Sequence, residues 1–414
     1  MVGTKACVAA SAAGGVQPQA SANARSFAQP ARRNERDTAE SVFGLPNRPT
    51  GDAFPAEASG VVSRSSSVTA ARQRRICTDF PCIQPPRTRL PKWGYYTAPM
   101  TVGEAIAWVG ARLQAAGLSE PQREAQALVA ACLGWERARL VAHPEARLSA
   151  LQAHRLERWA RRRAQREPLA YLTRRAWFYG LELIVGRGAL IPRPETELLV
   201  EVFLGWAKEK PLTPSPSPTA WARGAEFPLS RRAGEGDQGG EGSNFPILVD
   251  AGTGTGAIAL ACLMHAPRWL GVGIDRSRRA LRIAQANRHA LGLQARLMLV
   301  QGDWLRGLRT GSVDAVLSNP PYVLPDEWDA LPPEVSRYEP RGALLVPAGD
   351  PLRPYRRIAR GAHRSLRPGG LLALETSPRL APMIAEQLPA WGFPSPHIVR
   401  DYAGAMRVVW AVRA

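Results

Sequence analysis

The feature that most constrains the fold is a regular alternation of apolar and amphipathic segments that begins at Phe245. Four-to-seven-residue apolar runs predict buried strands, and the stretches between them have the three-to-four-residue spacing of amphipathic helices. Such an alternation predicts an α/β domain with a doubly wound parallel sheet covered on both faces, over residues 244–414. Ligands of these sheets bind at the carboxyl ends of the strands. The predicted strands are "FPILVD", "LGVGID", "ARLMLVQ", "VDAVLS", "GGLLALET" and the closing "MRVVWAV".

A different pattern precedes this domain. Residues 99–170 have helical periodicity, with helices expected over 101–117, from Ser119 to Gly134, and onward from Ser149. In the third helix we expect Leu151, Leu156 and Trp159 to point inward and the arginines outward. Residues 171–200 read as a hairpin followed by a linker and the start of another helix.

Two segments have the composition of chains that do not pack a core. Residues 1–98 are rich in Ala, Ser, Arg, Pro and Gly and lack periodicity, which predicts a disordered tail or an over-extended start, with an organellar transit peptide as the alternative. Met100, followed at once by a helix pattern, is then the expected initiator. Residues 211–243 are a Pro, Ser and Gly-rich insertion expected at the surface.

Charge and cysteine content limit the partners and the compartment. The formal net charge is +19, carried mainly by arginine, so contact with nucleic acid is compatible with the chain although not required. The five cysteines are scattered and lack paired spacing, which argues against a disulfide framework or a structural zinc site. No apolar run is long enough to span a membrane. We expect a monomer of the cytoplasm, with organellar import as the minor alternative.

A glycine-rich loop follows the first strand of the α/β domain. In "DAGTGTGAIALA" the residues Gly252, Thr253, Gly254, Thr255 and Gly256 lie between a strand and a helix, so a ligand can approach the backbone and the helix amino terminus. Loops of this kind bind NAD, FAD or S-adenosylmethionine, and the loop alone does not choose between them.

The next two strand ends carry further candidate contacts to a nucleoside. Asp275 ends "GVGID", where a carboxylate can accept hydrogen bonds from ribose hydroxyls; its alternative role is a helix cap. Asp303 and Trp304 follow the third strand and can flank an adenine. A tryptophan packed in the core is the alternative.

A rigid polar corner follows the fourth strand. In "SNPPYV", Asn319 is followed by Pro320 and Pro321, which lock φ and remove two backbone donors. The Asn319 side-chain carbonyl and the Pro320 carbonyl then form two converging acceptors for a substrate –NH2 group, and Tyr322 can stack on a planar group. As an isolated tetrapeptide this could be an ordinary turn, but its position after the glycine loop and Asp275 favours a catalytic role.

The chemistry that suits this corner is methyl transfer. Two acceptors orient the amine nitrogen toward a sulfonium methyl, and positioning for in-line attack supplies most of the catalysis without a metal or a general base. Hydride transfer is disfavoured because no His or Lys stands out as part of a hydride acceptor site.

These residues together resemble the peptide chain release factor glutamine methyltransferases, the HemK/PrmC-type protein-(glutamine-N5) methyltransferases. The resemblance covers Thr101 to Val412 apart from the insertion, and includes "EPLAYL", "FYGLELIV", the glycine loop, "SNPPYV" and, most discriminating, "LIPRPETELLV" from Leu190 to Val200. It implies a Rossmann-like class I S-adenosylmethionine-dependent methyltransferase domain with an antiparallel edge strand, preceded by a helical domain that docks the protein substrate. The reaction implied is methylation of the glutamine side-chain amide in the Gly-Gly-Gln motif of release factors.

The resemblance also implies roles for particular residues. The glycine loop, Asp275, Asp303, Trp304 and Asn319 would hold S-adenosylmethionine. The catalytic residues would be Asn319, Pro320 and Tyr322, and the substrate pocket would be lined by Pro192, Arg193, Pro194, Glu195 and Asn319 to Tyr322. The chain departs from the usual family pattern at Arg174 and Ser377, where Gly is more usual, and at Ala405 and Met406 between Asp401 and Arg407.

Three alternatives stay open at the level of sequence. A nucleic-acid amino-methyltransferase would use the same corner on a flipped base. A ribosomal-protein glutamine methyltransferase would look similar outside the Leu190 to Val200 segment. A catalytically idle RNA- or ribosome-binding factor would keep the fold without the activity.

Overall fold

The computed structural model describes residues 100–209 and 245–414. The expectations for residues 1–98 and 211–243 therefore lie outside the described residues. The helical segment contains α1 (Val102–Ala115), α2 (Pro121–Leu133), α3 (Arg137–Ala142), α4 (Ala150–Ala164) and α5 (Leu169–Thr173). Helices α1 and α4 start with capping boxes in which Thr101 and Ser149 bond reciprocally with Glu104 and Gln152.

The third predicted helix is present as α4, but two of its side chains point the other way from the prediction. Leu151 is 71% exposed, whereas Arg163 is only 6% exposed. At about 100° per residue, Leu151 lies roughly 140° around the helix from the buried Leu156, while Arg163 lies almost directly below it. The buried Arg163 guanidinium is bonded to the Glu124 carboxylate of α2, which balances its charge.

The predicted hairpin forms from β1 (Arg175–Phe178) and β2 (Leu181–Ile184), which pair antiparallel. Arg174, at a position where the resemblance expects glycine, ends α5 in the left-handed conformation with φ of 61°. Glycine adopts that conformation without strain, so the arginine here costs more than the glycine that the resemblance leads us to expect. A 3-10 turn, η2 (Pro194–Thr196), then leads into α6 (Glu197–Glu209).

The α/β domain has a seven-stranded sheet in the order β5-β4-β3-β6-β7-β9-β8. Neighbouring strands from β5 to β7 are parallel, and β9 is antiparallel to both β7 and β8. The antiparallel strand thus lies one place in from the edge. The edge strand, β8, was not predicted because its mostly exposed residues give no apolar run. The strands are β3 (Ile247–Ala251), β4 (Leu270–Asp275), β5 (Leu297–Gln301), β6 (Val313–Ser318), β7 (Leu366–Glu375), β8 (His397–Arg400) and β9 (Met406–Val412).

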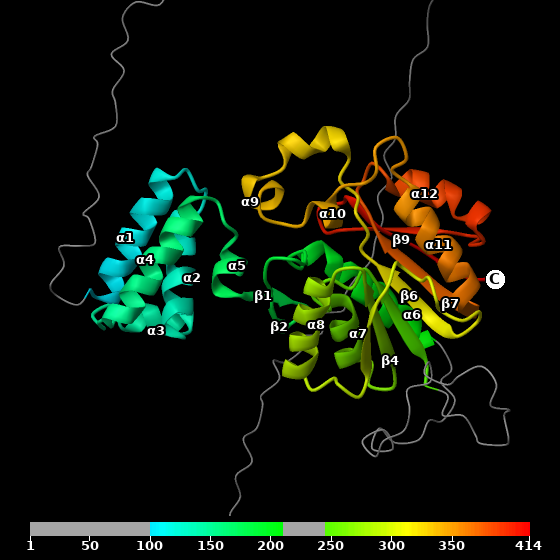
Figure 1. Ribbon diagram of the computed structural model, residues 1–414, viewed down its shortest axis with the longest axis horizontal. Helices are drawn as coiled ribbons and strands as arrows, with labels where there is room; N and C mark the ends of the chain where they lie inside the picture. Colours follow the sequence, from blue (N-terminus) through cyan, green and yellow to red (C-terminus); the bar gives the residue numbers. More distant parts are fainter. Residues whose placement is uncertain (1–99, 210–244) are drawn as a thin grey trace, which may run out of the picture. The chain divides into compact units, whose positions relative to one another are not determined.

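Helices cover both faces of this sheet (Figure 1). Successive residues of β3 alternate between two cores: Leu248 packs with α6 and α7, and Val249 packs with α11 and α12. This alternation is the period-two pattern of a strand buried on both sides. The remaining elements are α7 (Ala257–His265), α8 (Arg278–Ala290), η4 (Pro325–Ala330), α9 (Pro333–Ser336), α10 (Arg341–Leu344), α11 (Arg353–Ser365), α12 (Ala381–Gln387) and η5 (Pro389–Trp391).

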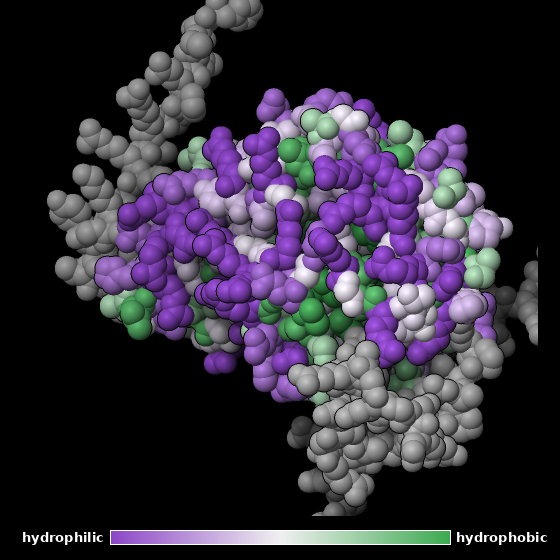
Figure 2. Space-filling view, turned by 45° about the vertical axis from the view of Figure 1, so that its right-hand side comes forward, coloured by the Kyte–Doolittle hydropathy of each residue, from purple (hydrophilic) through white to green (hydrophobic). Residues whose placement is uncertain are grey.

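The face of the molecule in Figure 2 is largely covered by hydrophilic residues, with hydrophobic residues showing between them. Within the described ranges, no helix has both the length and the apolar character needed to cross a membrane.

Candidate active site

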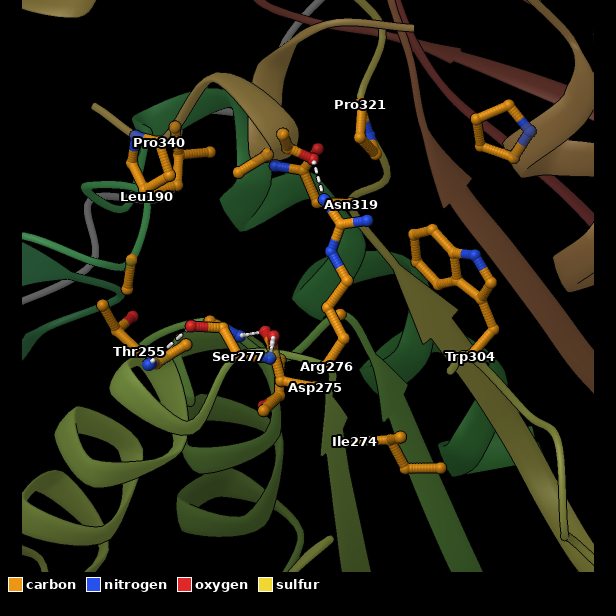
Figure 3. Close-up of a pocket in the computed structure, with 18 of the residues that line it drawn as sticks. Leu190, Thr255, Ile274, Asp275, Arg276, Ser277, Trp304, Asn319, Pro321 and Pro340 are labelled. Atoms are coloured by element: carbon orange, nitrogen blue, oxygen red, sulfur yellow. Dashed lines mark hydrogen bonds between the residues drawn. The ribbon is translucent and has the colours of Figure 1, made fainter. Parts of the chain in front are cut away.

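Four parallel strands bring their carboxyl ends to one side of the sheet, where a cavity of about 620 Å³ opens (Figure 3). The loop after β3, the Asp275 end of β4 and Asn319 after β6 all line this cavity, together with the segment Gly188 to Arg193. The site is therefore where ligands of doubly wound sheets bind.

The glycine loop is bent so tightly that its backbone faces the cavity. Gly252, Gly254 and Gly256 all have positive φ, at 81°, 57° and 85°. At Gly252 a Cβ atom would stand 3.2 Å from Cζ3 of Trp304, so a side chain here would intrude on the cavity wall.

The buried Asp250 side chain holds the loop in place. Its Oδ2 accepts hydrogen bonds from Thr253 Oγ1 at 2.7 Å and from the Ala259 N–H at 3.2 Å. Burial raises the pKa of Asp250 to about 6, although both hydrogen bonds favour the carboxylate. Asp250 is thus a structural support of the loop.

Asp275 points into the cavity from the end of β4 (Figure 3). Its Oδ2 accepts from the Gly254 N–H at 2.9 Å, and its Oδ1 accepts from the Ser277 N–H at 2.8 Å. The cap of helix α8 is Ser277, whose side chain accepts from the Ala280 N–H, so Asp275 does not have the capping role that was its alternative. A carboxylate has about four acceptor positions, so Asp275 can still bind hydroxyl groups.

Trp304 and Asp303 form the wall of the cavity after β5. Trp304 adopts a positive φ of 54°, and it both lines the cavity and packs against the core of α11 and α12. The core packing that was the alternative is therefore present in part, and the adenine contact stays a prediction. Asp303 is ion-paired with Arg357 of α11, which also lines the cavity.

The polar corner lines the same cavity, with Asn319 and Pro321 labelled in Figure 3. The Asn319 Nδ2 group donates to Thr196 Oγ1 at 3.1 Å. This bond uses the amino end of the carboxamide, so Oδ1 is the end that is free to accept from a ligand. Pro321 also lines the cavity, whereas Pro320 is buried.

Several predicted residues stand behind the cavity wall rather than on it. Tyr322 packs against the core of α11 and α12, and burial raises the pKa of its hydroxyl. Of the predicted segment Pro192 to Glu195, Pro192 and Arg193 line the cavity, while Pro194 is exposed in η2. Glu195 lies close enough to Tyr322 to affect its pKa, and Gly256 caps α7.

Three polar residues of the site were not predicted. Glu339, which is buried, accepts a hydrogen bond from the Ile191 N–H at 3.1 Å and pairs with Arg193, so it fixes that side of the cavity. Nothing in the sequence links residues this far apart. Thr196 could have been found because it directly follows Glu195 in the quoted "IPRPETE". Glu375 could have been found because it is the polar last residue of an apolar strand, as Asp275 is.

Glu375 is the buried partner of Thr196. Burial raises the pKa of Glu375 to about 7. A hydrogen bond from the Thr196 hydroxyl and the charges of Arg407 and Arg193 lower this pKa but do not offset the burial. Arg407 is ion-paired with Asp401 at 2.9 Å, so the D-x-x-G-x-x-R pattern closes a turn beside Glu375. The substitutions at Ala405 and Met406 leave that ion pair in place.

Comparison with known proteins gives matches over both parts of the chain. Residues 104–173 match the model of the PrmC N-terminal domain, and residues 243–330 match that of the methyltransferase small domain. The release factor glutamine methyltransferase of Caulobacter vibrioides is 35% identical over 317 residues, which are 76% of this chain and 98% of that protein. The Moorella thermoacetica protein of the same name is 36% identical over 316 residues, 76% of this chain and 99% of that one.

Proposed function

Because the chain belongs to the family of release factor glutamine methyltransferases, we propose that it methylates the side-chain amide nitrogen of the glutamine in the Gly-Gly-Gln motif of a release factor. The observation that carries the proposal is the corner at Asn319, whose amino group is bound by Thr196 and whose carbonyl oxygen is left for a substrate –NH2 group. The methyl donor is S-adenosylmethionine.

The cavity has the features that this donor requires. The backbone of the glycine loop lies against Trp304 with no room for a side chain at Gly252, and Asp275 keeps acceptor positions for ribose hydroxyls. Asp303 and Trp304 would border the adenine. When bound, S-adenosylmethionine supplies an electrophilic methyl group on a sulfonium.

The residues of the corner would bind and orient the glutamine amide. Asn319 Oδ1 and the Pro320 carbonyl would accept its two N–H groups, which fixes the nitrogen in one orientation toward the methyl group. Tyr322 and Glu195 would shape the wall behind them, and Pro192 and Arg193 would line the entrance for the protein substrate. The partner is thus a release factor, contacted by a monomeric enzyme without any need for nucleic acid.

A methylation assay with labelled S-adenosylmethionine tests this function. The substrates are a bacterial release factor, the same factor with its Gly-Gly-Gln glutamine replaced by alanine, ribosomal proteins and bulk RNA. The proposal predicts label on the intact factor and none on the alanine variant. Label on RNA alone would indicate a nucleic-acid methyltransferase, and no transfer to any of them would indicate an inactive binding factor; either result would overturn the proposal.

A further inference from the structure

Asn319 and Glu375 occupy equivalent positions at the ends of two paired strands. In the parallel register of β6 and β7, Ser318 lies opposite Leu374, so the next residues along each strand are Asn319 and Glu375. Thr196 arrives between them from η2, where it is 4% exposed, and Glu375 is 1% exposed. Three polar side chains from three elements thus meet at the cavity wall, which Asn319 and Thr196 line and behind which Glu375 is buried.

The hydrogen bonds between them have a defined direction. Thr196 Oγ1 accepts from Asn319 Nδ2 at 3.1 Å, and its own hydroxyl bonds to Glu375. A hydroxyl has a single proton. When Glu375 is a carboxylate, it can only accept, so the Thr196 proton must point to Glu375 and the Thr196 lone pairs must face Asn319.

This direction determines which end of the Asn319 carboxamide faces the cavity. A Thr196 oxygen that presents lone pairs binds –NH2 and repels a carbonyl oxygen, so Nδ2 turns inward and Oδ1 outward. We propose that Glu375 and Thr196 are positioning residues that set the rotation of the Asn319 amide, so that its oxygen meets the substrate amide. The inference rests on the proposed function for its kinetic consequence, but the orientation itself can be measured without substrate.

Protonation of Glu375 would remove this control. A neutral carboxyl can donate its own proton to Thr196, which frees the Thr196 hydroxyl to donate toward Asn319 and allows the amide to rotate. The pKa of about 7 places this change near neutral pH. The ionisable groups that influence Glu375 come from η2, the preceding loop, β9, the corner after β6 and α11: Glu195, Arg193, Arg407, Tyr322 and Tyr355.

Nitrogen-15 NMR of the asparagine side chains tests the orientation directly. The chain has six asparagines, so selective labelling gives few side-chain amide signals, and the one missing from Asn319→Ala belongs to Asn319. We expect this signal to shift with pH with a midpoint near 7 in the wild type, and to lose that shift in Thr196→Val and Glu375→Gln. Asn287, whose Nδ2 donates to the backbone oxygens of Ile184 and Thr255, is the internal control in the same spectra.

Single-turnover methylation of the release factor supplies the kinetic test. The rate constant in the wild type should rise with pH through about 7. Thr196→Val should lower it about tenfold, the scale of one lost hydrogen bond, and make it insensitive to pH. Affinity for S-adenosylmethionine, measured by calorimetry, should change less than the rate because the expected contacts of the glycine loop and Asp275 are kept. Thr196→Ser should restore both rate and pH dependence, and Thr173→Val, which removes a hydroxyl bonded to helix α5, should behave as wild type.

The outcomes separate this inference from the proposed function. If the wild type methylates the release factor but Thr196→Val keeps the full rate and its pH dependence, the positioning role is wrong and the function stands. A pH-dependent Asn319 signal without methylation of the factor would support the orientation and contradict the function. An Asn319 signal that does not respond to pH or to Glu375→Gln would overturn the inference.

Discussion

The Asn319 side chain is bonded to the protein at its amino end and presents its oxygen to the cavity. Its replacement by alanine should therefore reduce methyl transfer by at least about 100-fold, the scale of losing a preorganised polar group at the reacting centre. Affinity for S-adenosylmethionine should fall far less than the rate, because the glycine loop and Asp275 supply the other expected cofactor contacts. Steady-state kinetics and calorimetry on the same preparation check both expectations. Activity within a few-fold of wild type would refute the role of Asn319.

The polar and aromatic residues at the strand ends could be predicted from the sequence, whereas the residues that hold them in place could not. Asp275, Trp304 and Asn319 all line the cavity as the sequence led us to expect. Glu339 accepts a hydrogen bond from Ile191 but lies in a loop far away in the sequence, and neither periodicity nor spacing indicates such a contact. Tyr322 lies behind the wall because a corner of two prolines turns the chain away from the cavity after Pro321. Glu195, in η2, does not line the cavity either.

The glycine loop is the element whose backbone shape matters most to cofactor binding. Gly252→Ala would force a side chain into a left-handed conformation and toward Trp304. We expect affinity for S-adenosylmethionine to fall about tenfold or more, in line with strain on the order of 1–2 kcal/mol. Gly205→Ala is the matched control, because a Cβ at Gly205 in α6 would meet no atom within 4 Å. It should bind the cofactor normally and melt at the same or a higher temperature. Equal affinities for the two variants would contradict the account of the loop.

Elements with a strong apolar period were predicted, and elements without one were not. The central strands β3 and β6 are buried on both faces, so their apolar runs are visible in the sequence. Helix α3 has six residues and one buried side chain, Leu140, and strand β8 is exposed along most of its length. The prediction for Leu151 was wrong because five residues of helix rotate it away from the buried Leu156. The same rotation per residue places Arg163 on the buried face.

For the molecule as a whole, the buried carboxyls predict how stability depends on pH. Burial raises the pKa of Asp250 to about 6 and that of Glu375 to about 7, so the folded state binds protons more tightly than the unfolded state. Stability from these groups is complete below their ordinary pKa values and is lost as the pH rises through 6 to 7. The melting temperature should therefore fall between pH 5 and 8, by less in Glu375→Gln than in the wild type. A melting temperature that rises over this interval would contradict the burial of ionisable carboxyls. The methylation rate is expected to rise with pH whereas the stability is expected to fall. Unfolding could therefore not explain a lower rate at acidic pH.

We expect the catalytic residues to lie wholly within residues 100–414. The match to the relatives supports this boundary, since an alignment of 317 residues covers 98% of the Caulobacter vibrioides protein. A protein that starts at Met100 should therefore methylate the release factor with an unchanged kcat/KM. The two forms can be compared in one assay with circular dichroism as the control for folding. Loss of folding or of activity on truncation would show that residues 1–99 are needed.

We propose that the corner at Asn319 presents an acceptor to the amide of a glutamine. The most direct test of this proposal is tandem mass spectrometry of the release factor after one turnover with the wild type and with Asn319→Ala. We predict a single methyl group on the side-chain nitrogen of the Gly-Gly-Gln glutamine with the wild type, and almost none with the variant. A methyl group on any other residue, or the same yield from both proteins, would contradict the account.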